Sequence, residues 1–259
     1  MVLKKETISL AGIELELHDT GDGAPILFLH SGQGFSPQHP FVGLLAKERR
    51  LIAPSHPGFG RSTLPDWLDR PEDIAHVYLE LMDRLHLDRV DVIGCSLGGW
   101  IAAEMGTMAP ERFRKLVLVS PVGVKTGPVD KLDIPDIYAL SQEKVSQLLF
   151  HDPAKMQFDP AKLPDEELTI FVRNRETLAL LVWEPYMHDP KLRHRLHRLA
   201  VPTLFLRGES DGLVTADYLD RYARLLPNAR IETIPAAGHA VQVEQPEAFA
   251  RKVLAFLAP

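Results

Sequence analysis

Short apolar runs alternate with amphipathic segments along most of this chain, and that alternation limits the folds it can adopt. The runs "PILFLHS" (25–31), "RVDVIG" (89–94) and "RKLVLVSP" (114–121) have the length and apolar content of strands buried on both faces. Helical patterns separate them, the longest being "PEDIAHVYLELMDRLHL" (71–87). Repeated strand–helix units predict a mostly parallel sheet with helices on both faces.

The alternation is interrupted once, in the second half of the chain. The stretches "IYALSQEKVSQLLF", "DEELTIFVRNRETLALLVW" and "KLRHRLHRLA" all predict helices, with no clear strand between them. Strands return at "VPTLFLRG" (201–208) and "ARIETIP" (229–235). We therefore predict one core domain formed by residues 1–121 and 200–259, with residues 122–199 inserted as a helical cap.

Composition and charge exclude several classes of protein. The 259 residues carry a net charge of −6, which disfavours a nucleic-acid partner or an anionic membrane surface. The single cysteine, Cys95, cannot form a disulfide within the chain, which fits a reducing compartment. We find neither a signal-peptide pattern nor an apolar run of about 20 residues. We therefore expect a cytoplasmic protein with no membrane insertion.

The stretch "DVIGCSLGGW" (91–100) places Ser96 between a predicted strand and a predicted helix. A serine in such a turn is held at unfavourable backbone angles, and the strand and helix pass so close that the residues two positions before and after it must be very small. Gly94 and Gly98 meet that demand. The helix N-terminus leaves unpaired N–H groups, so the N–H of Leu97 can bond an oxyanion above Ser96. We interpret Ser96 as a nucleophile.

A serine hydroxyl needs a base, and the base needs an orienting carboxylate. The stretch "AAGHAVQVEQPEAF" (236–249) places His239 on a loop that follows a predicted strand, at the sheet edge where the sites of open α/β sheets gather. The stretch "LFLRGESDGLVT" (204–215) offers Glu209 and Asp211 on a similar loop. We favour Asp211 as the acid because it lies deeper in that loop.

Other residues are expected to surround the substrate. The loop "LHSGQGF" (29–35) follows a predicted strand, and we expect the N–H of Gly32 to be the second oxyanion donor. The proline in "LLVWEPYMHDP" would break a cap helix and turn its end toward the site. The expected substrate contacts are Ser31, Trp100, Trp183 and Met187.

Taken in order, five stretches resemble the α/β-hydrolase superfamily over essentially the whole chain. They are "FLHSGQG", "PGFGRS", "GCSLGGW", "PTLFLRGESD" and "PAAGHAVQVEQPE". The order Ser96, Asp211, His239 is also that of the superfamily's catalytic triad. The resemblance implies an eight-stranded, mostly parallel sheet with a helical cap inserted after the sixth strand. It also implies a site that needs neither a metal nor a cofactor.

Two positions depart from the superfamily's usual pattern. The first loop usually reads His-Gly, but this chain has Ser31 after His30. The meta-cleavage-product hydrolases, which cut carbon–carbon bonds, usually carry a tryptophan after the catalytic histidine, where this chain has Ala240. Haloalkane dehalogenases and epoxide hydrolases of this fold use an aspartate nucleophile, so Ser96 argues against both.

These residues lead to one expected activity and several alternatives. We expect a serine hydrolase that cleaves carboxylic esters with hydrophobic acyl or alcohol groups, working as a monomer or homodimer. Carbon–carbon hydrolysis of a vinylogous 1,5-diketone is the first alternative, with Arg173 or Arg175 holding a substrate carboxylate. Lactonase or perhydrolase chemistry and a non-catalytic, ligand-binding role remain open.

Overall fold

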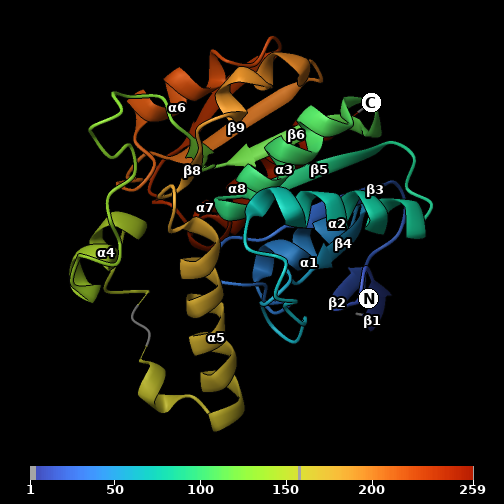
Figure 1. Cartoon of the computed structure of the whole chain (residues 1–259), viewed down its shortest axis with the longest axis horizontal. Coiled ribbons are helices and arrows are strands. Elements are labelled where there is room, and N and C mark those ends of the chain that lie inside the picture. The colour runs from blue at the N-terminus through green and yellow to red at the C-terminus, as the bar shows by residue number, and fades with distance from the viewer. Residues whose placement is uncertain (1–3, 157–158, 259) are drawn as a thin grey trace.

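An eight-stranded sheet forms the centre of the molecule, shown in Figure 1 as a computed structural model that describes residues 4–156 and 159–258. The strand order is β1-β2-β4-β3-β5-β6-β9-β10. The pairs β1–β2 and β2–β4 are antiparallel and the other pairs are parallel, so the predicted α/β fold is confirmed. The strands are β1 (Lys4–Leu10), β2 (Ile13–Thr20), β3 (Pro25–Leu29), β4 (Arg50–Pro54), β5 (Val90–Cys95), β6 (Phe113–Val119), β9 (Thr203–Gly208) and β10 (Ala229–Ile234).

Two hydrophobic clusters cover the two faces of this sheet. One contains buried residues of α2 (Pro71–Arg84), α3 (Leu97–Met108) and α6 (Ala216–Ala223). The other contains buried residues of α1 (Pro40–Ala46), α7 (Val241–Glu244) and α8 (Pro246–Leu257). Successive side chains of β5 alternate between the two clusters, as a strand buried on both faces requires. Cys95 belongs to the second cluster, and burial raises the pKa of its thiol.

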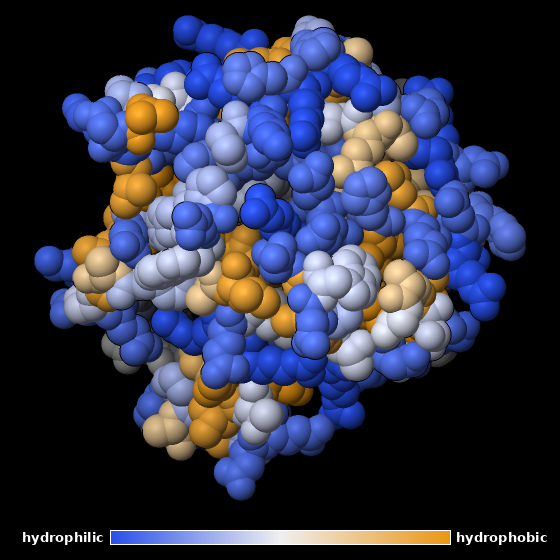
Figure 2. Space-filling view, viewed as in Figure 1, coloured by the Kyte–Doolittle hydropathy of each residue, from blue (hydrophilic) through white to orange (hydrophobic). Residues whose placement is uncertain are grey.

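The segment between β6 and β9 leaves the sheet. It contains the short parallel pair β7 (Gly123–Val124) and β8 (His188–Asp189), together with α4 (Gln142–Leu149) and α5 (Asp165–Val182). Figure 1 shows α4 and α5 projecting from one side of the sheet. The face of the molecule that this view presents is mostly hydrophilic, with separate apolar patches (Figure 2). No helix among the described residues could span a membrane.

The basic stretch 191–198 differs from its prediction as a helix. It forms two short 3-10 turns, Leu192–His194 and Leu196–Arg198. The N–H of Arg195 bonds to the carbonyl of Leu192 at 2.9 Å, which is the three-residue spacing of a 3-10 turn. The leucines of this stretch are buried in the first cluster, so tertiary packing decided the backbone form.

Candidate active site

Ser96 lies in a sharp turn between β5 and α3. Its backbone angles, φ 51° and ψ −110°, fall where residues with a side chain are rarely found. A Cβ atom added to Gly94 would lie 2.7 Å from the carbonyl carbon of Gly98, and one added to Gly98 would lie 2.5 Å from the carbonyl oxygen of His30. Both glycines are therefore sterically required, as the sequence predicted.

We expect Gly98→Ala to lower the free energy of unfolding by about 3 kcal/mol, because the added methyl group meets backbone atoms that cannot move aside. Urea denaturation measures this loss. Gly43→Ala is the matched control, since a Cβ atom there meets nothing within 4 Å. Gly43 lies inside α1, so the control is expected to stabilise the protein by about 0.5–1 kcal/mol. Equal effects of the two substitutions would contradict the steric account.

Asp211 and His239 face each other from the loops after β9 and β10. The Nδ1 atom of His239 lies 3.1 Å from Oδ2 and 3.3 Å from Oδ1 of Asp211. Asp211 is 4% exposed and His239 is 9% exposed. Glu209, the other acid considered from the sequence, is exposed at the surface. The structure therefore pairs His239 with the favoured carboxylate.

The environment of Asp211 keeps its carboxylate charged. Burial alone would raise its pKa, but the neighbouring His239 lowers it by charge and by hydrogen bonding, and the net shift is downward. The Oδ1 atom also accepts the N–H groups of Leu213 at 3.0 Å and Val214 at 2.8 Å. An ionised carboxylate fixed in this way can orient the imidazole ring and stabilise its protonated form.

Ser96 lies at the same edge of the sheet as this pair. It directly follows β5, and the two loops follow β9 and β10, all strands of one parallel array. In the described part of the chain, no hydrogen bond joins the Ser96 hydroxyl to His239. Bonds between a nucleophile and its base often tighten only when substrate binds. The Nε2 atom of His239, which faces away from Asp211, is the nitrogen left for that contact.

Two buried histidines hold the loop that carries Gly32. The Nδ1–H of His30 donates to the carbonyl of Ser31 at 2.6 Å, and its Nε2 accepts the backbone N–H of His56 at 2.8 Å. The ring of His56 in turn bonds the carbonyl of His30 at 2.8 Å and the hydroxyl of Tyr78 at 2.5 Å. Burial lowers the pKa of His30 to about 4, so its ring is neutral, as this bonding pattern requires. Both histidines therefore have a structural role in holding this loop.

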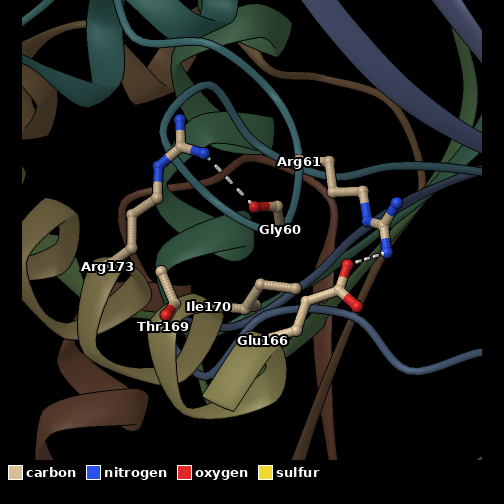
Figure 3. Close-up of a pocket in the computed structure, with 6 residues that line it drawn as sticks. All are labelled: Gly60, Arg61, Glu166, Thr169, Ile170 and Arg173. Carbon is tan, nitrogen blue, oxygen red and sulfur yellow. Dashed lines mark hydrogen bonds and ion pairs between the residues drawn. The ribbon is translucent and has the colours of Figure 1, made fainter.

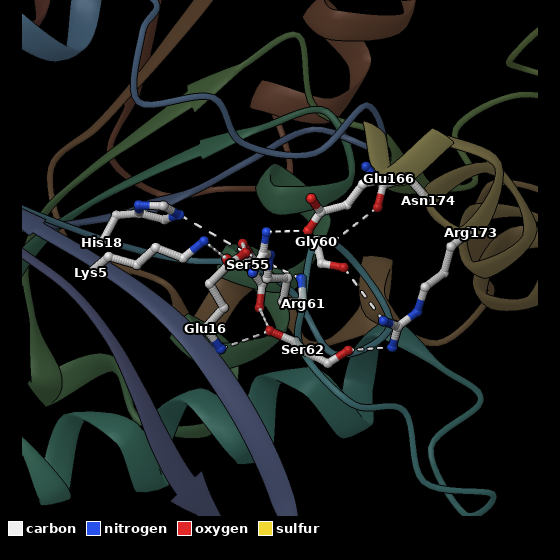
Figure 4. Close-up of polar contacts among 10 residues, drawn as sticks. All are labelled: Lys5, Glu16, His18, Ser55, Gly60, Arg61, Ser62, Glu166, Arg173 and Asn174. Carbon is white, nitrogen blue, oxygen red and sulfur yellow. Dashed lines mark hydrogen bonds and ion pairs between the residues drawn. The ribbon is translucent and has the colours of Figure 1, made fainter. Parts of the chain in front are cut away.

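The helix α5 lies over the same loop, through contacts that sequence reasoning missed. The buried amide of Asn174 accepts the N–H of Gly60 at 2.9 Å (Figure 4). It also donates to the carbonyl of Gln33 at 3.3 Å. A Cβ atom on Gly32 would lie 2.7 Å from a methyl carbon of Leu178. The sequence held one signal for this contact. Asn174 and Leu178 are four residues apart on a predicted helix, so they lie on one face, and that face could have been assigned to the loop.

The four expected substrate contacts are spread through different surroundings. Trp100 is 3% exposed, and its N–H donates to Glu104 at 3.1 Å, so the side chain packs in the core because α3 is buried on nearly all sides. Trp183 is instead 59% exposed. Met187 is buried and its carbonyl accepts the N–H of Gly123, whereas the hydroxyl of Ser31 accepts the N–H of Gln33.

A surface cavity of about 340 Å³ opens beside α5 (Figure 3), and Ser96 is not among the residues that line it. One wall carries the ion pair between Arg61 and Glu166. The guanidinium of Arg173 donates to the carbonyls of Gly60 and Ser62, so it ties α5 to the neighbouring loop. The cavity is lined by Gly60, Arg61, Glu166, Thr169, Ile170 and Arg173.

Neither arginine considered as a carboxylate ligand is placed for that role. Arg173 is occupied by backbone carbonyls, and the exposed Arg175 lies 5.8 Å from the ring centre of Phe171. Within the described residues, no group of three or more His, Cys, Asp or Glu side chains could hold a metal ion.

Comparison with known proteins agrees with this architecture. A model of the alpha/beta hydrolase family matches residues 26–252. A 2-hydroxy-6-oxo-2,4-heptadienoate hydrolase from Pseudomonas putida is 30% identical, covering 95% of this chain and 94% of its own length. A 2-hydroxymuconate semialdehyde hydrolase from P. putida is 30% identical, covering 97% and 93%. The structure of a 2-hydroxy-6-oxo-6-phenylhexa-2,4-dienoate hydrolase from a Rhodococcus species superposes with a TM-score of 0.77 at 20% identity, covering 98% of each chain. The chain therefore belongs to the alpha/beta hydrolase family.

Proposed function

We propose that this hydrolase cleaves the carbon–carbon bond of a 2-hydroxy-6-oxo-dienoate, with Ser96 as nucleophile, His239 as base and Asp211 as the orienting acid. The observation that carries the proposal is the similarity of nearly the whole chain to relatives named as hydrolases of this substrate class. The Asp211–His239 pair supports it, because this chemistry needs an activated serine. This reaction class was the first alternative from the sequence, and the comparisons favour it over ester cleavage.

The proposed reaction begins with the 2-oxo tautomer of the substrate. The Nε2 atom of His239 takes the proton of the Ser96 hydroxyl, and the oxygen adds to the distant ketone carbon. The N–H groups of Leu97 and Gly32 bond the resulting oxyanion. The adjacent carbon–carbon bond then breaks, and its electron pair passes along the conjugated chain to the 2-oxo oxygen. The proton held by His239 goes to that oxygen.

The second half of the reaction frees the serine. Water loses a proton to the Nε2 atom of His239 and attacks the acyl group on Ser96. The acyl carbon–oxygen bond to Ser96 then breaks, His239 returns the proton to the serine oxygen, and a carboxylic acid is released. We propose that residues 122–199 act as a cap over this site, because α5 lies directly against the loop that carries Gly32. A cap that excludes bulk water strengthens the hydrogen bonds to the oxyanion.

Ester hydrolysis by the same three residues is the second candidate. Two observations favour it: Ala240 stands where the carbon–carbon hydrolases usually carry tryptophan, and Arg173 is bound to the carbonyls of Gly60 and Ser62. The carboxylate of a dienoate substrate would then lack Arg173 as an ion-pair partner. An ester needs no such partner, and an acyl-enzyme on Ser96 would be common to both reactions.

Competing substrates test the choice between the two reactions. We expect kcat/KM for 2-hydroxy-6-oxo-2,4-heptadienoate to exceed that for p-nitrophenyl butyrate by about 100-fold or more, because the site favours one transition state over the other. The experiment follows loss of dienoate absorbance and release of p-nitrophenol by the same enzyme preparation. Turnover of the ester without turnover of the dienoate would assign ester hydrolysis. If neither is turned over, a non-catalytic member of the family is indicated.

A further inference from the structure

Residues 148–152, here called the strap, lie against the two loops that carry Asp211 and His239. The strap comprises the end of α4 and the residues that follow it. The carbonyl of Leu148 accepts the N–H of Gly212 at 3.0 Å, and the carbonyl of Leu149 accepts the N–H of His239 at 2.7 Å. The backbone N–H of the proposed base is therefore bonded to the segment between β6 and β9.

The strap fits closely against the base loop. A Cβ atom added to Gly238 would lie 2.5 Å from the carbonyl oxygen of Leu149 and 2.8 Å from the Cα atom of Phe150. The ring of His151 adds a second link, because its Nδ1 lies 2.7 Å from the hydroxyl of Ser210, the residue before Asp211. A small displacement of the strap would therefore move both catalytic loops.

The carboxylate of Glu244 joins the strap to the base loop. Its Oε2 atom accepts the N–H of Gly238 at 2.6 Å. Its Oε1 atom accepts the N–H of His151 at 2.9 Å and that of Asp152 at 3.3 Å. Hydrogen bonds to an ionised acceptor are about twice as strong as neutral ones. Glu244 lies at the end of α7, five residues after His239.

We propose that Glu244 is a positioning residue for His239, acting by clamping the strap onto the base loop; this rests on the proposed function of His239 as the base. Without the clamp, the N–H of His239 loses its fixed partner, Leu149, and the imidazole is no longer held between Asp211 and Ser96. The effect falls on the chemical step, since Glu244 has no contact with the reacting atoms.

Substitution of Glu244 tests the clamp. We expect Glu244→Ala to lower kcat by about 10–100-fold and to leave KM within about threefold, because small misplacements of catalytic groups act on the chemical step. The kcat of Glu244→Gln is expected to lie between those of Glu244→Ala and the unsubstituted protein. Its amide has one acceptor oxygen, which cannot serve both the strap and Gly238. Reaction of Ser96 with a fluorophosphonate should slow in parallel, and hydrogen exchange should rise at the strap and at His239.

Glu247→Ala is the matched control, because Glu247 is exposed in the first turn of α8. A purely structural role would lower the urea midpoint of Glu244→Ala while leaving kcat of the folded protein unchanged, and this result would overturn the proposal. An equal effect of Glu247→Ala would also overturn it. If Glu244→Ala does not fold, Glu244→Gln decides by the same criteria.

His239→Ala, measured alongside, separates this inference from the proposed function. Normal turnover by His239→Ala would refute the assignment of the base. Inactive His239→Ala together with fully active Glu244→Ala and Glu244→Gln would leave the base in place and refute only the clamp.

Discussion

Replacing Ser96 with alanine is expected to lower kcat by at least about 10⁴-fold on the dienoate and on the ester, because both proposed reactions use Ser96 as the nucleophile. Alanine meets the same backbone angles as serine, φ 51° and ψ −110°, so the turn should keep its shape. The folded state should therefore be as stable as that of the unsubstituted protein, and the whole effect should appear in turnover.

Steady-state kinetics on both substrates, with urea denaturation of the same samples, measure this result. Ser9→Ala is the control, because Ser9 is an exposed residue of β1 on the far side of the sheet order from β9 and β10. Turnover by Ser96→Ala within tenfold of the unsubstituted protein would show that another residue, or water acting directly, attacks the substrate.

Asp211→Asn is expected to lower kcat by about 10³–10⁴-fold with little loss of stability. The amide oxygen can still accept the N–H groups of Leu213 and Val214, so the loop keeps its shape. The amide nitrogen then faces Nδ1 of His239 and donates to it, which places the ring proton on Nε2. The tautomer formed in this way cannot take the proton of Ser96.

The pH dependence of the unsubstituted protein follows from the lowered pKa of Asp211. That carboxylate is charged above its folded-state pKa, which is lowered below the usual aspartate value, so near neutral pH its own titration does not change activity. The stability it contributes is present above its unfolded-state pKa and is lost as pH falls through the lower folded-state pKa. Glu209→Gln is the matched control for Asp211→Asn. If Glu209→Gln lost activity and Asp211→Asn retained it, the orienting acid would be Glu209.

The sequence predicted those parts of the molecule that depend on local sterics and on the order of strands and helices. Gly94 and Gly98 fix the turn at Ser96 because the clearance they provide depends on neighbouring backbone alone. The pairing of Asp211 with His239 was predictable because both follow parallel strands, whose C-terminal ends share one edge of the sheet.

Contacts between distant segments could not be predicted in the same way. Asn174 reaches Gln33 across 141 residues, and Glu244 reaches His151 across 93, and no periodic pattern marks either pair. The packing of Trp100 against the core was also hidden, because a short apolar helix does not show which of its sides a sheet will cover. Arg173 looked available in the sequence, and only the fold revealed the two carbonyls that occupy it.

The most direct test of the central claim is to locate the residue that becomes covalently modified. The unsubstituted protein and the His239→Ala variant are treated with a fluorophosphonate, and the adduct is mapped by peptide mass spectrometry. The account predicts one adduct, on Ser96, which forms rapidly in the unsubstituted protein and at least about 100-fold more slowly in the variant. An adduct on a different residue, or active enzyme that carries an adduct on Ser96, would contradict it.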